Sequence, residues 1–360
     1  TNPVTGFNSA TEEGLKLPSG TNANLPTGVQ GMIRNDTDET TGSSASAIEH
    51  HNGTNWQYFA ATESLDVPPI NVDYLVVAGG GAGGRLGGGG GAGGYRTSFG
   101  SGSINGGLTA VETSQNLLVG ISYTVTIGAG ASSVFNGNNT LANSGSDSIF
   151  DGITSITSTG GGGGRNHSDG NGGSGGSGGG APSAGNSFSG GSRETSPVQG
   201  FSGAANSAAV PYPGGGGGGA GAAGSTPNGG TALSSSITGT ATLIAGGGGG
   251  GSQTGYYGGS LVNPGGGGGA GNGSGSSTAG SNAVNNTGSG GGGGGYSNNY
   301  GLGGSGGSGL VILRYPIANN INIVTGTSPI AADLNTTVAG STTEKFTRFT
   351  ATGAVTFTIT

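Results

Sequence analysis

Discrete blocks of glycine constrain the fold of this chain more than any other feature. Glycine supplies 92 of the 360 residues, and most of it lies between residues 79 and 309. Ordering the backbone costs about 1–2 kcal/mol per residue, and glycine loses more freedom than any other residue. A glycine block therefore remains a flexible linker unless close backbone packing offsets that cost. The blocks, some interrupted by Ala, Ser or Asn, span residues 79–84, 87–94, 160–164, 170–180, 214–224, 246–251, 265–273, 288–295 and 303–309.

Two features favour packing over flexible linkers. The separators between blocks carry aromatic, Pro, Arg or His residues, and apolar strand-like segments flank the region. A polyproline-II-type helix has three residues per turn and no internal hydrogen bonds, so its N–H and C=O groups point sideways toward neighbouring chains. A helix surrounded on all sides needs glycine at nearly every position, as in 246–251, whereas the Ala-diluted block 214–224 suits an outer layer. We therefore predict at least about eight such helices, packed as a polyglycine-II sandwich.

Ordinary strands are predicted around and between the blocks. Segments 72–78 and 310–315 are rich in β-branched and aromatic residues, and shorter strand-like segments occur at 122–127, 149–156 and 237–245. The predicted fold class is mostly irregular and β: a polyglycine-II (polyproline-II-type) helical sandwich flanked by small β modules, with essentially no α-helix. The predicted divisions are a small β fibre-like module at 1–70, the glycine-rich domain with a β base at 71–316, and a small β C-terminal segment at 317–360.

Charge and composition exclude several classes of partner. The net charge is −7, and the 9 Lys and Arg residues are spread thinly, so no basic stripe is available to neutralise nucleic-acid phosphates. The longest apolar runs, 75–78 and 310–313, are far shorter than the roughly 20 residues of a spanning helix, so we expect no membrane insertion. The chain has no cysteine, which excludes disulfides. It starts at Thr1 without an apolar leader, and we expect a fragment or a processed product.

Motifs for catalysis or metal binding are weak. Matches to G-x-G-x-x-G are expected from the glycine content alone, and the Gly-Lys-Ser or Gly-Lys-Thr ending of a phosphate-binding loop does not occur. The histidines His50, His51 and His167 have no clustered ligand-type partners in the sequence. The pair Glu12-Glu13 is typical of a solvated acidic turn. We predict no enzyme activity, no catalytic residue, no cofactor and no metal site.

Several segments resemble the glycine-rich domain of phage tail-fibre proteins. They are 72–78 (Val-Asp-Tyr-Leu-Val-Val-Ala) with the glycines that follow, 91–97 (Gly-Ala-Gly-Gly-Tyr-Arg-Thr), 123–129 (Tyr-Thr-Val-Thr-Ile-Gly-Ala), the 246–251 block and 309–316 (Gly-Leu-Val-Ile-Leu-Arg-Tyr-Pro). This resemblance covers residues 72–316. Segments 31–36 (Gly-Met-Ile-Arg-Asn-Asp) and 52–56 (Asn-Gly-Thr-Asn-Trp), the latter with an Asn-Gly hairpin signal, are similar to a short module repeated in phage fibre proteins.

The resemblance implies a receptor-binding adhesin in an extracellular virion tail fibre. By analogy with the distal adhesins of T-even-like phages, a rigid glycine scaffold presents tip loops that bind a bacterial surface receptor, an outer-membrane protein or a glycan, during host attachment. Other tail-fibre chains are further implied partners, with a homotrimer as one arrangement. The loops vary within that family, so no loop residue is carried over to this chain.

Counting chain reversals predicts which separators lie at the binding end. If strands 72–78 and 310–315 pair, the glycine region starts and ends at the same end of the domain, which we call the base. If each glycine block then crosses the domain once, successive separators lie alternately at the base and at the opposite end, the tip. A weak run at 200–206 must supply one further pass. Separators 296–302, 252–264 and 207–213 then lie at the tip, and 274–287 and 225–245 at the base. The predicted receptor-binding residues are Arg85, Leu86, Arg165, Asn166, His167, Asp169, Tyr212, Tyr256, Tyr257, Tyr296, Asn298, Asn299 and Tyr300.

Other functions remain open at the level of sequence. One is a purely structural extracellular filament or a bacterial surface adhesin, in which glycine packing is itself the function. Another is ice binding by a flat polyglycine face, although Tyr-rich separators argue against it. An alternative for the tyrosines is that they plug the ends of the bundle.

Overall fold

The computed structural model describes residues 19–20, 33–36, 47–51, 54, 56–58, 68–102, 104–133, 140–167, 170–253, 262–327, 329 and 333–360. The chain divides into two compact units, Thr1–Pro68 and Pro69–Thr360. The described residues contain no α-helix, and their helical structure is the 3-10 turn η2 Gly106–Leu108. No helix in this part of the chain is long and apolar enough to cross a membrane. A mostly irregular and β fold without α-helix is thus confirmed.

The first unit contains one sheet, in the strand order β1-β2-β3-β4. Strands β3 and β4 pair antiparallel, with His51 opposite Trp56, as expected for a hairpin. The predicted turn residues Asn52 and Gly53 lie outside the described residues. The strands of this sheet are β1 Ser19–Gly20, β2 Ile33–Asp36, β3 Ala47–His51 and β4 Trp56–Tyr58.

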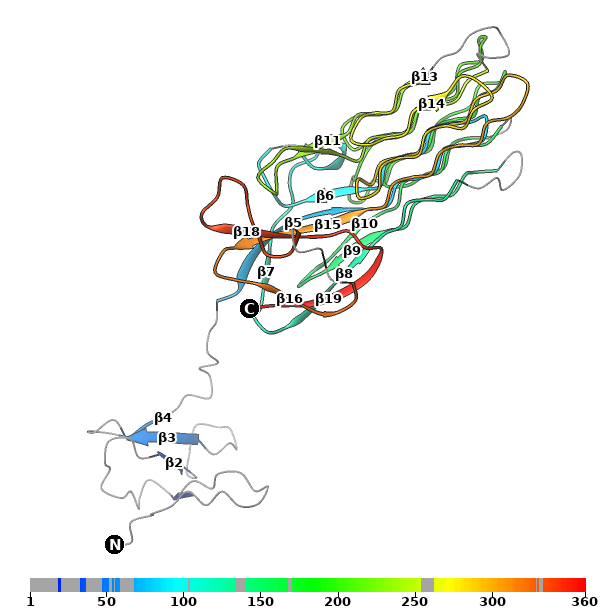
Figure 1. Ribbon diagram of the computed structural model, residues 1–360. Coiled ribbons are helices and arrows are strands. Elements are labelled where there is room, and N and C mark those ends of the chain that lie inside the picture. Colours follow the sequence, from blue (N-terminus) through cyan, green and yellow to red (C-terminus); the bar gives the residue numbers. More distant parts are fainter. Residues whose placement is uncertain are drawn as a thin grey trace. The chain divides into compact units, whose positions relative to one another are not determined.

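The second unit has two larger sheets at one end, from which the glycine runs extend (Figure 1). The 6-stranded sheet has the order β17-β18-β15-β5-β6, with β7 also paired to β5, and comprises β17 Thr336–Thr337, β18 Glu344–Phe349, β15 Leu310–Pro316, β5 Ile70–Val77, β6 Tyr95–Thr97 and β7 Gln115–Leu117. The 5-stranded sheet comprises, in order, β10 Ser155–Ser158, β9 Ser148–Asp151, β8 Ser122–Ile127, β19 Gly353–Ile359 and β16 Ile321–Thr325. We call this pair of sheets the base.

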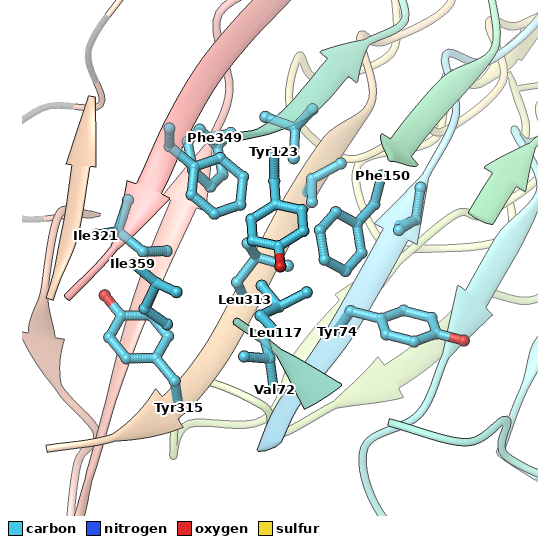
Figure 2. Close-up of a cluster of buried hydrophobic side chains, with 14 of the residues drawn as sticks. Val72, Tyr74, Leu117, Tyr123, Phe150, Leu313, Tyr315, Ile321, Phe349 and Ile359 are labelled. Atoms are coloured by element: carbon cyan, nitrogen blue, oxygen red, sulfur yellow. The ribbon is translucent and has the colours of Figure 1, made fainter. Parts of the chain in front are cut away.

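The two base sheets enclose an ordinary hydrophobic core (Figure 2). Strand β5 alternates in the two-residue period of a strand, so Val72 and Tyr74 face the 5-stranded sheet, while Leu75 and Val77 face the opposite side. A second cluster covers that opposite side through the hairpin of β11 Leu233–Ser235 and β12 Thr242–Ile244. The larger core includes Leu117, Tyr123, Phe150, Leu313, Tyr315, Ile321, Phe349, Phe357 and Ile359.

The residues after 316 contribute strands to both base sheets. Strand β18 pairs with β15, and β19 lies between β8 and β16. Residues 317–360, predicted as a C-terminal segment of their own, therefore complete the base, and residues 69–360 form a single unit.

The glycine runs have a hydrogen-bond period of three, unlike the strands of the base. In the run 87–94, successive N–H groups donate to three neighbouring segments in turn, at N···O distances between 2.8 and 3.3 Å. Residues 88, 91 and 94 donate to 165, 162 and 159; residues 89 and 92 donate to 215 and 218; residues 87, 90 and 93 donate to 294, 291 and 288. The run 247–252 repeats this pattern toward segments 227–230, 87–90 and 271–274. A β-strand has a period of two, so these runs are bonded in a different way.

Close backbone approach explains why the runs consist of glycine. A Cβ added to Gly90 would lie 2.0 Å from the carbonyl oxygen of Gly81, and one added to Gly248 would lie 2.0 Å from that of Gly291. Real Cβ atoms essentially never come within 3.0 Å of another heavy atom. Any side chain at these positions would separate hydrogen-bonded neighbours.

Two glycine blocks reverse direction internally, so the prediction of one pass per block is wrong. Block 265–273 turns at Gly267, Gly268 and Gly269, which all have positive φ, and β13 Val262–Asn263 then pairs antiparallel with β14 Gly273–Ser274. In block 170–180, the N–H of Gly179 donates to the carbonyl of Gly173, so the two halves lie side by side. Outside the glycine blocks, the N–H groups of Ala131, Ala142 and Gly145 likewise donate to glycine runs, at residues 80, 164 and 161.

Candidate functional site

Two chain reversals meet at the end of the glycine runs that lies away from the base, which we call the tip. The turn at Arg85 and Leu86 is closed by a hydrogen bond from the N–H of Gly84 to the carbonyl of Gly88 (2.8 Å). The turn at 296–300 is closed by a bridge between Tyr296 and Tyr300. The N–H of Leu86 donates to the carbonyl of Gly301 at 3.2 Å, which fixes the two turns against each other.

Side chains from three separate turns converge on the ring of Tyr300. The guanidinium carbon of Arg85 lies 4.4 Å from the ring centroid. The ring of His167 approaches edge-on at 5.5 Å, and the ring of Tyr296 lies at 4.8 Å. Tyr300 keeps an exposed fraction of 38%. These four residues form what we call the tip cluster, a partly exposed aromatic ring held by a cation and two other rings.

Asn166 joins the turns beneath the tip cluster. Its side-chain oxygen accepts from the N–H of Arg85 (2.8 Å), and its amide nitrogen donates to the hydroxyl of Thr140 (2.9 Å). The N–H of His167 donates to the carbonyl of Arg85 at 3.0 Å. Asn166 is 2% exposed and Leu86 is 1% exposed, so both hold the turns in place and offer no surface to a ligand. Arg165, next to Asn166, is half-buried and bridges to Leu141.

The remaining predicted site residues lie outside the tip cluster. Half-buried Tyr212 belongs to a neighbouring turn, whose Pro211 carbonyl accepts from the N–H of Gln253 (3.0 Å). This turn lies at the same end, because the N–H of Gly214 donates to Gly251, which in turn donates to Gly87. Asn298 and Asn299 are exposed on the 296–300 turn. Asp169, Tyr256 and Tyr257 lie outside the described residues.

The tip also contains a turn that the sequence prediction placed at the base. The hydroxyl of Ser277 accepts from the N–H groups of Asn298 (3.1 Å) and Asn299 (3.2 Å). The hydroxyls of Ser274 and Thr278 lie 2.7 Å apart within the same turn. Separator 274–287 therefore spans the length of the runs: residues 274–278 lie at the tip, and Thr287 bonds to Ser308 near the base. The Ser-rich run 274–277 is the only sequence signal for this turn.

One family model matches most of the chain: the glycine-rich domain, over residues 59–316. The chain belongs to this family. The match covers β5, the glycine runs, the tip turns and β15, which is the part of the second unit built around close backbone packing. No curated protein sequence matches the chain.

The ion pairs described for the glycine-rich domain and its C-terminal strands lie in the base, where each joins a strand to a second strand or to a loop. The Arg96 guanidinium lies 2.6 Å from the Glu112 carboxylate, which also accepts from the hydroxyl of Tyr74 (2.9 Å). Burial raises the pKa of Glu112, but hydrogen bonds from Arg96, Asn105 and Tyr74 and the charge of Arg96 outweigh it and hold the pKa below its ordinary value. Arg314–Glu344 and Arg348–Asp333 are the other such pairs.

Two further features of the base are a buried tyrosine hydroxyl and a small cavity. Burial raises the pKa of Tyr315 to about 12, despite its bonds to Thr347 and Asn335, so its hydroxyl stays protonated near neutral pH. A cavity of about 50 Å³ beside β11, β12 and β15 is lined by Ile237, Ile244 and Arg348 among others. The described residues include no group of three or more His, Cys, Asp or Glu that could hold a metal ion.

Proposed function

We propose that this chain is a receptor-binding adhesin of a phage tail fibre, carried outside the cell on the virion, and that its tip contacts a bacterial surface receptor during attachment. The observation that carries the proposal is the convergence of Arg85, His167, Tyr296 and Tyr300 at one end of a scaffold whose backbone is hydrogen-bonded throughout. Aromatic and arginine side chains dominate the binding energy of recognition surfaces. A stiff support reduces the entropy lost when such side chains bind.

We further propose that the glycine runs are polyglycine-II helices packed as a sandwich. The three-residue repeat of hydrogen bonds in 87–94 and 247–252 supports this assignment, because three residues make one turn of a polyproline-II-type helix. The carbonyl contacts that exclude a Cβ at Gly90 and Gly248 support it further. Such a scaffold fixes the two ends of each tip turn through backbone hydrogen bonds, and side chains such as Asn166 and Ser277 then hold the turns against one another.

Binding, rather than catalysis, fits the composition of the tip. The tip cluster pairs one partly exposed tyrosine with a cation and two other rings, and its neighbours on the 296–300 turn are the neutral side chains of Asn298 and Asn299. The proposed role therefore needs no cofactor and no metal.

The test compares tip and base variants on a panel of bacterial strains. The tip variant combines Arg85→Ser, Tyr296→Ser and Tyr300→Ser. The control combines Ile121→Ser and Val324→Ser, two exposed base positions. We expect wild type and control to adsorb to at least one strain and the tip variant to bind about tenfold or more weakly, with similar melting temperatures. Equal adsorption by a folded tip variant would overturn the proposal, and head-to-tail polymers of purified protein would favour a structural filament instead.

A further inference from the structure

We infer that the tip binds a neutral, hydroxyl-rich glycan of the bacterial surface, with a sugar ring packed on Tyr300. This inference rests on the proposed adhesin function and names the chemical class of its receptor. The observations that carry it are the fixed ring of Tyr300, a rim of uncharged hydrogen-bonding groups beside it, and the low net charge of the tip turns.

The Tyr300 ring is a prepared stacking surface. Arg85 lies over the ring and His167 contacts it edge-on, each from another turn, and Tyr296 packs against it from the same turn, so its orientation is fixed before any ligand arrives. The backbone is fixed as well, because the N–H of Tyr300 donates to the side chain of Asn299 at 3.0 Å. The C–H groups on one face of a sugar pack well against such a ring, and an exposed fraction of 38% leaves room for that contact.

Neutral polar groups surround this ring. Asn298, Asn299 and Thr278 are exposed, and the carbonyl of Thr278 accepts from the N–H of Gly295 (3.4 Å), at the start of the Tyr300 turn. Ser277 binds the backbone of Asn298 and Asn299, so the turns 274–278 and 296–300 form one continuous surface. Amides and hydroxyls both donate and accept hydrogen bonds, which suits the hydroxyl groups of a sugar.

The charge of the tip disfavours a polyanionic receptor. In the sequence, segments 85–86 and 165–169 contain two arginines, Arg85 and Arg165, and one acidic residue, Asp169, and segments 207–213, 274–278 and 296–300 contain no Asp, Glu, Lys or Arg. Binding to a strongly acidic polysaccharide would need several cations, and it would weaken steeply with salt.

In the described part of the tip, the apolar surface is too dispersed for a folded protein partner. Apart from Tyr300, its exposed large apolar residues are Leu141, Val210 and Leu302, each on a different turn or run. Stable protein interfaces bury about 800 Å² on each partner around clustered apolar anchors. Apolar residues scattered singly over a surface do not form such an interface.

The experiment uses the full chain and a strain to which it adsorbs. Mild periodate, which cleaves vicinal diols, should abolish adsorption, whereas proteinase treatment of the cells should leave it intact. Raising the salt to about 1 M, where the Debye length is about 3 Å, should change the affinity less than about threefold. Tyr300→Ser should weaken binding about tenfold, while Tyr300→Phe, which keeps the ring, should retain it. Asn298→Ala combined with Thr278→Ala should weaken binding about threefold or more.

The outcomes separate this inference from the proposed function. If no strain adsorbs wild-type protein, the adhesin function itself fails. If adsorption survives periodate but is lost with proteinase, the receptor is a protein and the glycan inference alone is overturned. Loss of adsorption at high salt would indicate an acidic polymer and would overturn it as well. Equal binding by Tyr300→Ser and wild type would overturn the inference that a sugar ring packs on Tyr300.

Discussion

The base and the glycine runs bury their backbones by opposite means. In the base, large side chains such as Tyr74, Phe150 and Phe357 fill the space between two sheets and exclude water from the hydrogen-bonded strands. In the runs, glycine has no side chain, so neighbouring backbones come into direct contact and their N–H and C=O groups hydrogen-bond to one another. The cost of a change in the base therefore depends on how much side chain is lost, whereas at the glycine positions of an inner run even a single methyl group meets a backbone carbonyl. The following predictions test that difference.

The largest effect is expected from one methyl group inside the runs. Gly90→Ala and Gly248→Ala each place a Cβ 2.0 Å from a backbone carbonyl oxygen, which cannot move without breaking its own hydrogen bonds. We expect each to destabilise the second unit by about 4 kcal/mol or more. Thermal or denaturant unfolding of soluble protein measures this, and failure to express in soluble form would agree with it.

The matched control is a glycine with open space around it. At Gly185, an added Cβ meets nothing closer than an atom of Tyr212 at 3.8 Å. Gly185→Ala should leave stability unchanged or raise it by about 0.4–1 kcal/mol, because alanine restricts the unfolded chain. Equal destabilisation by Gly185→Ala and Gly90→Ala would mean that close approach is not the reason for glycine in the runs.

A core truncation in the base should cost a similar amount or less, and a larger apolar replacement should restore part of the lost stability. Phe357 is fully buried, with its ring centroid 5.7 Å from that of Phe349 and 6.0 Å from that of Tyr123. Phe357→Ala should destabilise the fold by about 3–5 kcal/mol, and Phe357→Leu by clearly less, since it leaves a smaller cavity. Denaturant unfolding of the three proteins gives the ranking. Identical losses for both variants would show that the base is as intolerant as the runs.

A smaller, pH-dependent effect should come from Glu112, since the runs themselves carry almost no titratable groups. Because the folded state lowers the pKa of Glu112, its contribution is complete above the unfolded pKa of about 4.3 and is lost as the pH falls through the folded pKa. Glu112→Gln should therefore reduce the loss of stability between neutral and acidic pH. Melting temperatures recorded against pH for both proteins check this, and parallel curves would argue against it.

The smallest effect on stability is expected at the tip. The Tyr300 side chain is partly exposed and does not pack between two glycine runs. Tyr300→Ser should therefore change the unfolding free energy by about 0.5 kcal/mol or less. Calorimetry of the variant beside wild type measures the change. A loss of several kcal/mol would indicate that the tyrosines plug the end of the runs, which is the structural alternative to binding.

Sequence patterns predicted the central base strands well because side chains carry the signal. Two shorter predictions were wrong in extent: segment 149–156 contains the turn between β9 and β10, and segment 237–245 contains the turn between β11 and β12. The β-branched segments 72–78 and 310–315 correspond closely to β5 and β15. The reversal at Gly267–Gly269 could not be predicted, because glycine occurs both in the runs and in the turns. Glycine also adopts positive φ without steric cost, so a turn needs no other residue type. This missed reversal is what misplaced the turn at Ser277.

The tip was predicted in outline, and its internal order was not. The convergence of Arg85, His167 and Tyr300 agrees with the end to which counting reversals assigned them. The burial of Asn166 depends on hydrogen bonds to Arg85 and Thr140, which are distant in sequence and become partners only in the folded chain. The sequence around a polar loop residue does not show such partners, so the residue is predicted to be exposed at the surface.

The pairing of β5 with β15 continues beyond the base, along the two glycine runs that join these strands to the tip. Val77 lies opposite Leu310 in the ladder. Further along, the N–H groups of Gly80, Gly83 and Leu86 donate to the carbonyls of Gly307, Gly304 and Gly301 in turn. The alignment set by one pair of base strands therefore also determines which residues meet at the far end. A one-residue insertion or deletion in either run would shift the Arg85 turn against the Tyr300 turn, so the length of these runs is under the same constraint as the register of a sheet.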